Sequence, residues 1–159
     1  MPRLSPLCQL NGGCMGCCGH DFPSRDKIAE AIQQNTNEFL QINPHTEEEF
    51  LSFRNRRPAM DLRQGVCRNL VREKGCTLCP LHPLRHQHKD LRLGHCDVDY
   101  FCATAEAFET WDEGRKKAFV EFVTGKKQDN LIYSMKMDRG ELMNEFLEIY
   151  SMTDYLRNI

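Results

Sequence analysis

Several features of secreted, membrane-embedded and nucleic-acid-binding proteins are missing from the sequence. The first residues do not form the apolar stretch of a secretory signal, and no apolar run reaches the length that crosses a bilayer. The formal net charge of -2 shows no basic excess, and the basic run Arg54–Arg57 is expected to be a solvated face. We therefore expect a cytoplasmic protein without membrane or nucleic-acid partners.

The common catalytic motifs are missing as well. The chain contains no G-x-G-x-x-G, no P-loop, no G-x-S-x-G and no H-E-x-x-H. Because many reactions need none of these motifs, their absence does not decide whether the chain is an enzyme.

What the chain does contain is cysteine, with nine residues in two groups. The first group is Cys8, Cys14, Cys17 and Cys18, and the second is Cys67, Cys76, Cys79, Cys96 and Cys102. A reducing cytosol keeps thiols from pairing, and an odd number of them does not close a disulfide framework. The two groups therefore indicate metal binding.

Two C-x2-C pairs carry this interpretation. Cys14 and Cys17 form one pair and Cys76 and Cys79 form the other. At this spacing one short turn presents two sulfurs to one metal, and two such turns can close a site. We expect both groups to meet around one site or two neighbouring ones. Zinc and iron–sulfur clusters both accept thiolates, so the spacing does not choose between them.

Cys18 and His86 complete the set of candidate ligands. Adjacent side chains diverge, so Cys17 and Cys18 are expected to reach two sites or two irons of one cluster, unless Cys18 is simply packed. A short helix is expected between residues 80 and 90, where His82 and His86 would share one face, and His86 is the candidate nitrogen ligand. The predicted metal ligands are Cys8, Cys14, Cys17, Cys18, Cys67, Cys76, Cys79, Cys96, Cys102 and His86.

The rest of the sequence predicts helices. Ser24 is placed to cap a helix over residues 25–40, and Thr46 with Glu49 forms a capping box for a second. Residues 65–102 look irregular, without strand alternation, and helical patterns return from Ala103. We predict a mainly α, small single domain of short helices with cysteine-rich metal-binding loops. Residues 1–102 would form the cysteine-cluster region, and residues 103–159 would form C-terminal helices packed on it.

Beyond these patterns, two stretches of the chain resemble the YkgJ-type cysteine-cluster family, described as a zinc- or iron-chelating domain. The positions that match its opening are Cys14, Cys17, Cys18, Asp26, Ile28, Ala29, Glu38, Phe39 and Leu40. The positions that match its second signature are Gly65, Cys67, Leu70, Cys76, Leu78 and Pro83. The resemblance covers roughly Cys8 to Cys102 and implies chelation rather than a particular reaction.

The chain departs from that family pattern at four places. Asn11 stands where the first cysteine of the opening turn belongs, Cys79 replaces a tyrosine, His82 an arginine and His86 the last cysteine. Under the resemblance, either His86 supplies a nitrogen ligand or Cys79 supplies the missing sulfur.

The leading hypothesis is therefore a metal-binding protein with an iron–sulfur cluster, the 4Fe-4S form included, or Zn2+. Its role would be redox chemistry, electron transfer or recognition of a protein partner. The alternatives are a redox or group-transfer enzyme that uses the centre, and a sensor or soft-metal binder that uses the vicinal Cys17–Cys18 dithiol.

Overall fold

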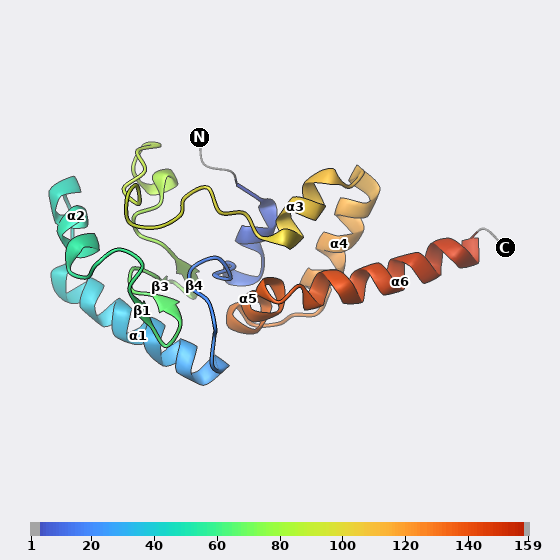
Figure 1. Cartoon of the computed structure of the whole chain (residues 1–159), viewed down its shortest axis with the longest axis horizontal. Coiled ribbons are helices and arrows are strands. Elements are labelled where there is room, and N and C mark those ends of the chain that lie inside the picture. Colours follow the sequence, from blue (N-terminus) through green and yellow to red (C-terminus); the bar gives the residue numbers. More distant parts are fainter. Residues whose placement is uncertain (1–3, 158–159) are drawn as a thin grey trace. The chain divides into compact units, whose positions relative to one another are not determined.

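The chain is mainly α-helical, which confirms the predicted fold class. A computed structural model describes residues 4–157 of the chain. Within that range the α-helices are Arg25–Ile42 (α1), Glu47–Asn55 (α2), Ala103–Thr110 (α3), Glu113–Gly125 (α4), Asn130–Asp138 (α5) and Glu141–Arg157 (α6) (Figure 1). The short 3-10 helices are Pro6–Gly12 (η1) and Pro83–Arg85 (η2).

Residues 4–157 divide into two compact units that interleave along the chain. Cys17–Tyr100 forms one, which we call the hairpin unit; Leu4–Gly16 and the chain from Phe101 onward form the other, the helical unit. The sequence predicted a single domain with its cysteine region running from residue 1 to residue 102. The structure instead places Leu4–Gly16, with two of the cysteines, among the C-terminal helices.

Helix α1 begins and packs as its sequence predicts. The Ser24 hydroxyl accepts the Lys27 amide hydrogen, which satisfies one donor of the first turn. Ile28, Ala31 and Ile32 recur at helical spacing and are buried, so α1 presents one apolar stripe to the hairpin unit.

The predicted capping box of α2 is also confirmed. The Glu49 amide donates to Thr46 Oγ1 over 3.2 Å, and the Thr46 amide donates to Glu49 Oε2 over 3.0 Å. Phe53 at the far end of α2 is fully buried. The core cluster that it joins consists of Phe53, Val71, Leu81 and Leu91.

Two antiparallel hairpins occupy part of the region that the sequence analysis described as irregular. Leu62–Arg63 (β1) pairs with Val66–Cys67 (β2), and Val71–Glu73 (β3) pairs with Cys76–Leu78 (β4) (Figure 1). Each turn is an X-Gly pair with positive φ at both residues, the geometry of a type I′ turn. Strands of two or three residues are too short to show an alternating pattern, which is why the prediction missed them.

The helical unit is built on a larger apolar cluster. Asp112 caps α4 and Asp129 caps α5, each by accepting an amide hydrogen of the first helical turn. Helix α5 was not predicted as a segment of its own. The buried members of the cluster are Leu7, Phe108, Phe119, Val123, Tyr133, Met137, Leu142 and Phe146.

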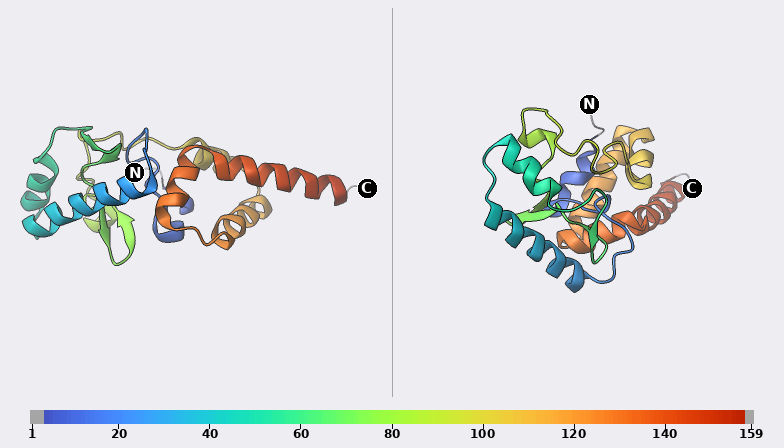
Figure 2. Two further views of the ribbon diagram at one scale, coloured as in Figure 1. Left: turned by 90° about the horizontal axis from the view of Figure 1, so that it is seen from below. Right: turned by 60° about the vertical axis from the view of Figure 1, so that its left-hand side comes forward.

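Helix α6 is the long C-terminal element of this unit, and Figure 2 shows its far end extending past α4. Ile149, Met152 and Leu156 are exposed along that half of the helix. None of the helices within residues 4–157 combines the length and the apolar content that a membrane crossing requires.

Candidate metal sites

The two units divide the nine cysteines differently from the two groups in the sequence. The hairpin unit holds Cys17, Cys18, Cys67, Cys76, Cys79 and Cys96, and the helical unit holds Cys8, Cys14 and Cys102. The boundary falls between Gly16 and Cys17, inside the first C-x2-C pair. The structure joins none of the nine, all of which are described, by a disulfide.

Backbone hydrogen bonds join the segment that contains Cys18 to β2 and the turn before it. The Cys67 amide donates to the Cys18 carbonyl over 2.8 Å, and the His20 amide donates to the Gly65 carbonyl over 3.0 Å. Gly19, with a φ of +144°, allows this approach, because a Cβ built there would lie 1.9 Å from the Gly65 oxygen. Residues almost fifty positions apart in sequence are thereby held side by side.

Five thiols of this unit lie within reach of one another's charge, and we call them the hairpin thiol cluster: Cys17, Cys18, Cys67, Cys79 and Cys96. A hydrogen bond with the Cys17 side chain, burial and neighbouring thiols raise the pKa of Cys18 well above its usual value. Burial, together with the Cys67 and Cys96 charges, raises the pKa of Cys79 to about 12. Such mutual repulsion of thiolates is what a bound cation relieves.

The Cys17–Cys18 doublet behaves differently from the prediction. Its side chains were expected to diverge, but they hydrogen-bond to each other. The charges of Cys67 act on Cys18, and the charge of Cys17 acts on Cys67. The charges of both members of the doublet therefore interact with that of Cys67.

Backbone amides donate to two sulfurs of the cluster. The amides of Asn69 and Leu70 hydrogen-bond to the Cys67 side chain, and the amide of Leu81 hydrogen-bonds to that of Cys79. Burial raises the pKa of both thiols, and these amide donors partly oppose it because they favour the thiolate. Helix α1 holds the turn after β2, because its Asn35 side-chain amide donates to the carbonyls of Cys67 and Leu70.

Arg56 was expected to lie on a solvated face, and the structure shows that this expectation is wrong. Its side chain is only 13% exposed and donates to the Phe53 carbonyl, Glu38 and the Asn69 side chain, each over 2.8–2.9 Å, and to the Arg68 carbonyl. Its charge lowers the pKa of Cys67 against the effect of burial. Arg56 is thus part of the support for the Cys67 turn rather than a member of a solvated face.

A second cation stands beside Cys79 and Cys96. Arg92 forms a two-point pair with Asp90, with distances of 2.8 and 2.7 Å, and both side chains are largely buried. Burial raises the pKa of Cys96, and the Arg92 charge opposes that rise there and at Cys79. Neither arginine could be predicted from a short motif, because tertiary packing brings each of them to the hairpin thiol cluster.

Two predicted ligands have other surroundings. Cys76 opens β4 and is exposed, whereas its neighbour Thr77 points inward and is buried. His86 donates from Nε2 to the Pro80 carbonyl over 2.7 Å and packs edge-on against Phe50.

The predicted helix between residues 80 and 90 is absent from the described structure, where a single 3-10 turn, η2, stands in its place. His82 caps η2 through Nδ1, which accepts the Leu84 amide hydrogen over 3.2 Å. The two prolines of the segment, Pro80 and Pro83, leave too few backbone donors for a longer helix. His82 and His86 therefore do not share a helix face.

The charges of the three cysteines of the helical unit act on a tyrosine that the sequence did not predict as part of a site. Tyr133 on α5 is fully buried and donates its hydroxyl hydrogen to the Leu7 carbonyl over 2.7 Å. Burial raises the pKa of Tyr133, and the charges of Cys14, Cys8 and Cys102 raise it further. Nothing in the sequence links a tyrosine at 133 to cysteines at 8, 14 and 102.

No three Cys, His, Asp or Glu side chains within residues 4–157 already stand together as ligands of one metal ion. The donor chemistry nevertheless suits a thiophilic metal, because the hairpin thiol cluster offers sulfurs with amide donors and two arginines nearby. Binding would require the thiols to close around the metal and to lose their protons.

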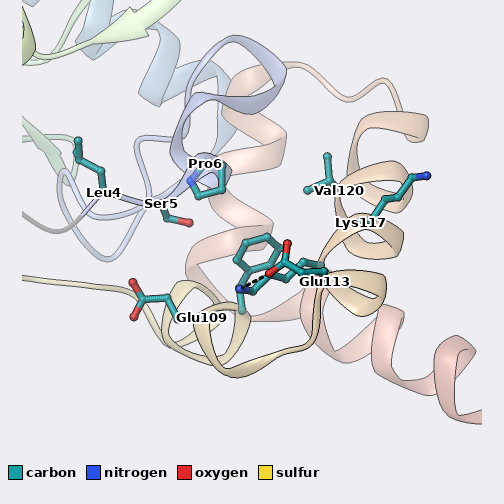
Figure 3. Close-up of a pocket in the computed structure, with 9 residues that line it drawn as sticks. Leu4, Ser5, Pro6, Glu109, Glu113, Lys117 and Val120 are labelled. Atoms are coloured by element: carbon teal, nitrogen blue, oxygen red, sulfur yellow. Dashed lines mark hydrogen bonds and ion pairs between the residues drawn. The ribbon is translucent and has the colours of Figure 1, made fainter.

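A pocket of about 510 Å³ lies within the helical unit, between the start of η1 and helices α3 and α4 (Figure 3). Its wall is partly apolar, from residues such as Val120, and partly charged, with Glu113 and Lys116 paired over 3.1 Å. No cysteine is among the residues that line it.

No protein-family model, no curated protein and no solved structure matches the chain. The resemblance to the YkgJ-type family stays a prediction. Any function must be argued from the thiols themselves.

Proposed function

We propose that the chain is a cytoplasmic metal-binding protein whose hairpin unit holds a cysteine-ligated centre, first an iron–sulfur cluster and second zinc. The observation that carries this proposal is the gathering of five thiols from three separate stretches of the chain. Thiols that raise one another's pKa have a strong tendency to bind a cation, since the cation offsets the repulsion between thiolates. The role that follows is redox chemistry, electron transfer or recognition of a protein partner.

The proposed ligand set is Cys67, Cys79, Cys96 and one member of the Cys17–Cys18 doublet. Cys67, Cys79 and Cys96 supply three sulfurs, so one sulfur of the doublet completes four. The other member of the doublet would remain its hydrogen-bond partner. Four sulfurs match both a 4Fe-4S cluster and a closed zinc site. A nitrogen ligand from His86 would suit zinc, which accepts mixed sulfur and nitrogen ligands. The hydrogen bond of His86 to Pro80 and its packing against Phe50 leave a donor set of sulfur alone.

The surroundings of the sulfurs favour iron–sulfur over zinc. Amides donate to Cys67 and Cys79, and hydrogen bonds to sulfur tune the potential of iron–sulfur clusters. Arg56 and Arg92 place positive charge beside a set of four thiolates. An iron–sulfur cluster would supply one-electron redox chemistry, and the protein would supply its ligands, its amide donors and its counter-charge.

The test is anaerobic purification of the full chain, followed by an absorption spectrum and by assays of iron, zinc and acid-labile sulfide. We expect a brown protein with iron and sulfide. The Cys67→Ser variant should lose at least nine-tenths of the metal, whereas the matched Cys76→Ser variant, altered at an exposed thiol of the same unit, should keep it. Stoichiometric zinc in a colourless protein would replace the cluster with a zinc site. A chain without either metal would overturn the proposal.

One observation favours a second candidate, a vicinal-dithiol binder of soft metals. The Cys17 and Cys18 side chains hydrogen-bond to each other, and Cys17 is exposed. A trivalent arsenical bridges two neighbouring thiols, so the reduced, metal-stripped chain should bind phenylarsine oxide one-to-one. Loss of this binding in Cys17→Ser, but not in Cys76→Ser, would support this candidate.

A further inference from the structure

The loop that follows α2 and the loop that leads to Cys96 are joined by hydrogen bonds within the hairpin unit. The Met60 amide donates to the His95 carbonyl over 3.3 Å. From the last turn of α2, Arg54 Nη1 donates to the Leu91 carbonyl over 2.9 Å. The two loops therefore form one continuous surface, and the second of them ends at Cys96, a proposed ligand of the centre.

Each of these loops exposes one large apolar side chain. Met60 is 65% exposed and Leu93 is 61% exposed. Met60 also has a φ of +62°, and among the non-glycine residues with positive φ within residues 4–157 it is the only apolar one. The left-handed region disfavours a side chain, whereas glycine adopts it freely. Folding therefore gives no reason for a methionine here, but contact with a partner does.

Positive charge lies beside these two apolar side chains. From Arg54 and from Leu91 onward, the first acidic residues along the two loops are Asp61 and Asp97, and Asp61 is engaged in an ion pair. Arg54 donates to an asparagine side chain and to backbone carbonyls, which leave its charge in place. Arg57 is exposed, and the ion pairs described for this region belong to other arginines. The surface is therefore basic as well as apolar.

A protein partner with an acidic contact face fits this surface better than a nucleic acid does. Transient protein interfaces combine an apolar contact with complementary charge at the rim, and redox partners bury little area. Arginine and methionine are enriched at such interfaces. Single-stranded nucleic acids instead stack their bases on aromatic side chains, and residues 54–60 and 91–96 contain no Phe, Tyr or Trp.

We propose that Arg54, Arg57, Met60 and Leu93 form a docking surface for a protein partner whose contact face is acidic around an apolar patch. This docking surface rests on the proposed function in one respect, because Cys96 is exposed and a partner bound here would meet the centre at that sulfur. The two arginines attract and orient the partner, and the two apolar side chains supply the contact that excludes water.

The test is calorimetric titration of the full chain, with the metal that it holds when purified, at low and at high salt. The probes are an acidic carrier protein (flavodoxin), a basic one (cytochrome c) and a single-stranded oligonucleotide. We expect flavodoxin alone to bind, and to bind more weakly at high salt because salt screens exposed charges.

Two variants locate the surface. Arg57→Glu reverses a charge and Met60→Gly removes an apolar side chain, and each should weaken flavodoxin binding about tenfold. Met60→Gly should do so without lowering the melting temperature, because glycine fits the positive φ of that position. The matched controls Arg72→Gln and Leu84→Ser, altered at exposed residues of the same unit, should bind as wild type does.

Flavodoxin binding that neither variant weakens, no flavodoxin binding at low salt, or a preference for cytochrome c or the oligonucleotide would overturn the docking surface. The outcome is separable from the proposed function. A chain that holds zinc but binds flavodoxin through Arg57 and Met60 would correct the proposed metal alone. A brown chain with iron and sulfide that shows no such binding would overturn the docking surface alone.

Discussion

The two units of this chain are stabilised in different ways. The helical unit packs Phe108, Phe119 and Phe146 into one aromatic cluster, with ring centroids 5.1–6.2 Å apart along its two Phe119 contacts. The hairpin unit has a smaller core around Phe53 and relies on polar ties such as those of Arg56. Buried aromatic area stabilises the first directly, whereas the second also carries the proposed metal centre, whose ligands lie in and beside short strands and turns. We therefore expect the two units to respond differently to the same perturbation.

Loss of metal should give the largest difference between the units. Structural metal binding supplies on the order of 10 kcal/mol in small thiolate domains, and the proposed ligands Cys67 and Cys79 both belong to the hairpin unit. On chelation or in Cys67→Ser, amides of β1–β4 should lose most of their protection, while those of α4 and α5 keep it. Hydrogen exchange by mass spectrometry measures both units in one sample. Equal loss in both units, or none in either, would contradict the comparison.

Truncation of Phe119 should have the opposite effect. Phe119 is fully buried and contacts the Phe108, Trp111 and Phe146 rings, so Phe119→Ala removes aromatic area and leaves a cavity. The helical unit should lose about 3–5 kcal/mol in its free energy of unfolding. Urea denaturation followed by tryptophan fluorescence reports it, because Trp111 lies in this cluster. Metal content should stay at the wild-type level.

Acid should weaken the hairpin unit through Glu38. Burial alone would raise the pKa of this carboxyl, but hydrogen bonds from Arg63 and Arg56 outweigh it and hold the pKa below its usual value. The pair stabilises the folded state above the unfolded pKa of about 4.3, and this contribution is lost as the pH falls through the lower folded value. In Glu38→Gln, the free energy of unfolding should be lower at pH 7 and flatter between about pH 5 and 3. Chemical denaturation of the metal-loaded chain across this range measures the slope against that of the exposed control Glu48→Gln, in which any acid-driven loss of metal is the same.

The smallest expected effect is at the α2 cap. Thr46→Ala removes the hydroxyl that accepts the Glu49 amide hydrogen, at a cost of about 1 kcal/mol. Thr46→Ser should keep most of the cap. Hydrogen exchange by mass spectrometry should show this loss as weaker protection of the α2 amides. A loss of similar size at the α4 amides would show that the two units do not unfold separately.

The sequence was most informative where structure is local. Ser24 and the Thr46–Glu49 pair act within one helical turn, and their hydrogen bonds are those that the spacing predicts. The hairpins were missed because strands as short as Leu62–Arg63 and Val66–Cys67 carry no periodic signal.

The grouping of the cysteines was less predictable. C-x2-C spacing suggested that Cys14 and Cys17 act together; the boundary between the two units falls between them, and their joint action stays a prediction. Cys17 and Cys18 reach Cys67 through the close passage of Gly19 over Gly65, a contact that depends on the whole hairpin unit. The hydrogen bond from His86 to the Pro80 carbonyl likewise depends on a turn, in a segment where the sequence predicted a helix.

The interleaved chain path has a consequence for synthesis on the ribosome. The loop with Cys8 and Cys14 is made first, but Tyr133, which bonds to Leu7 across 126 positions of sequence, emerges only after the complete hairpin unit. At ~5–20 residues per second this interval is on the order of 6–25 s. During that time the hairpin unit has all its own residues available, whereas the two early thiols wait without their partners. The nascent chain thus exposes Cys8 and Cys14 to the cell before the helices that pack against this loop exist.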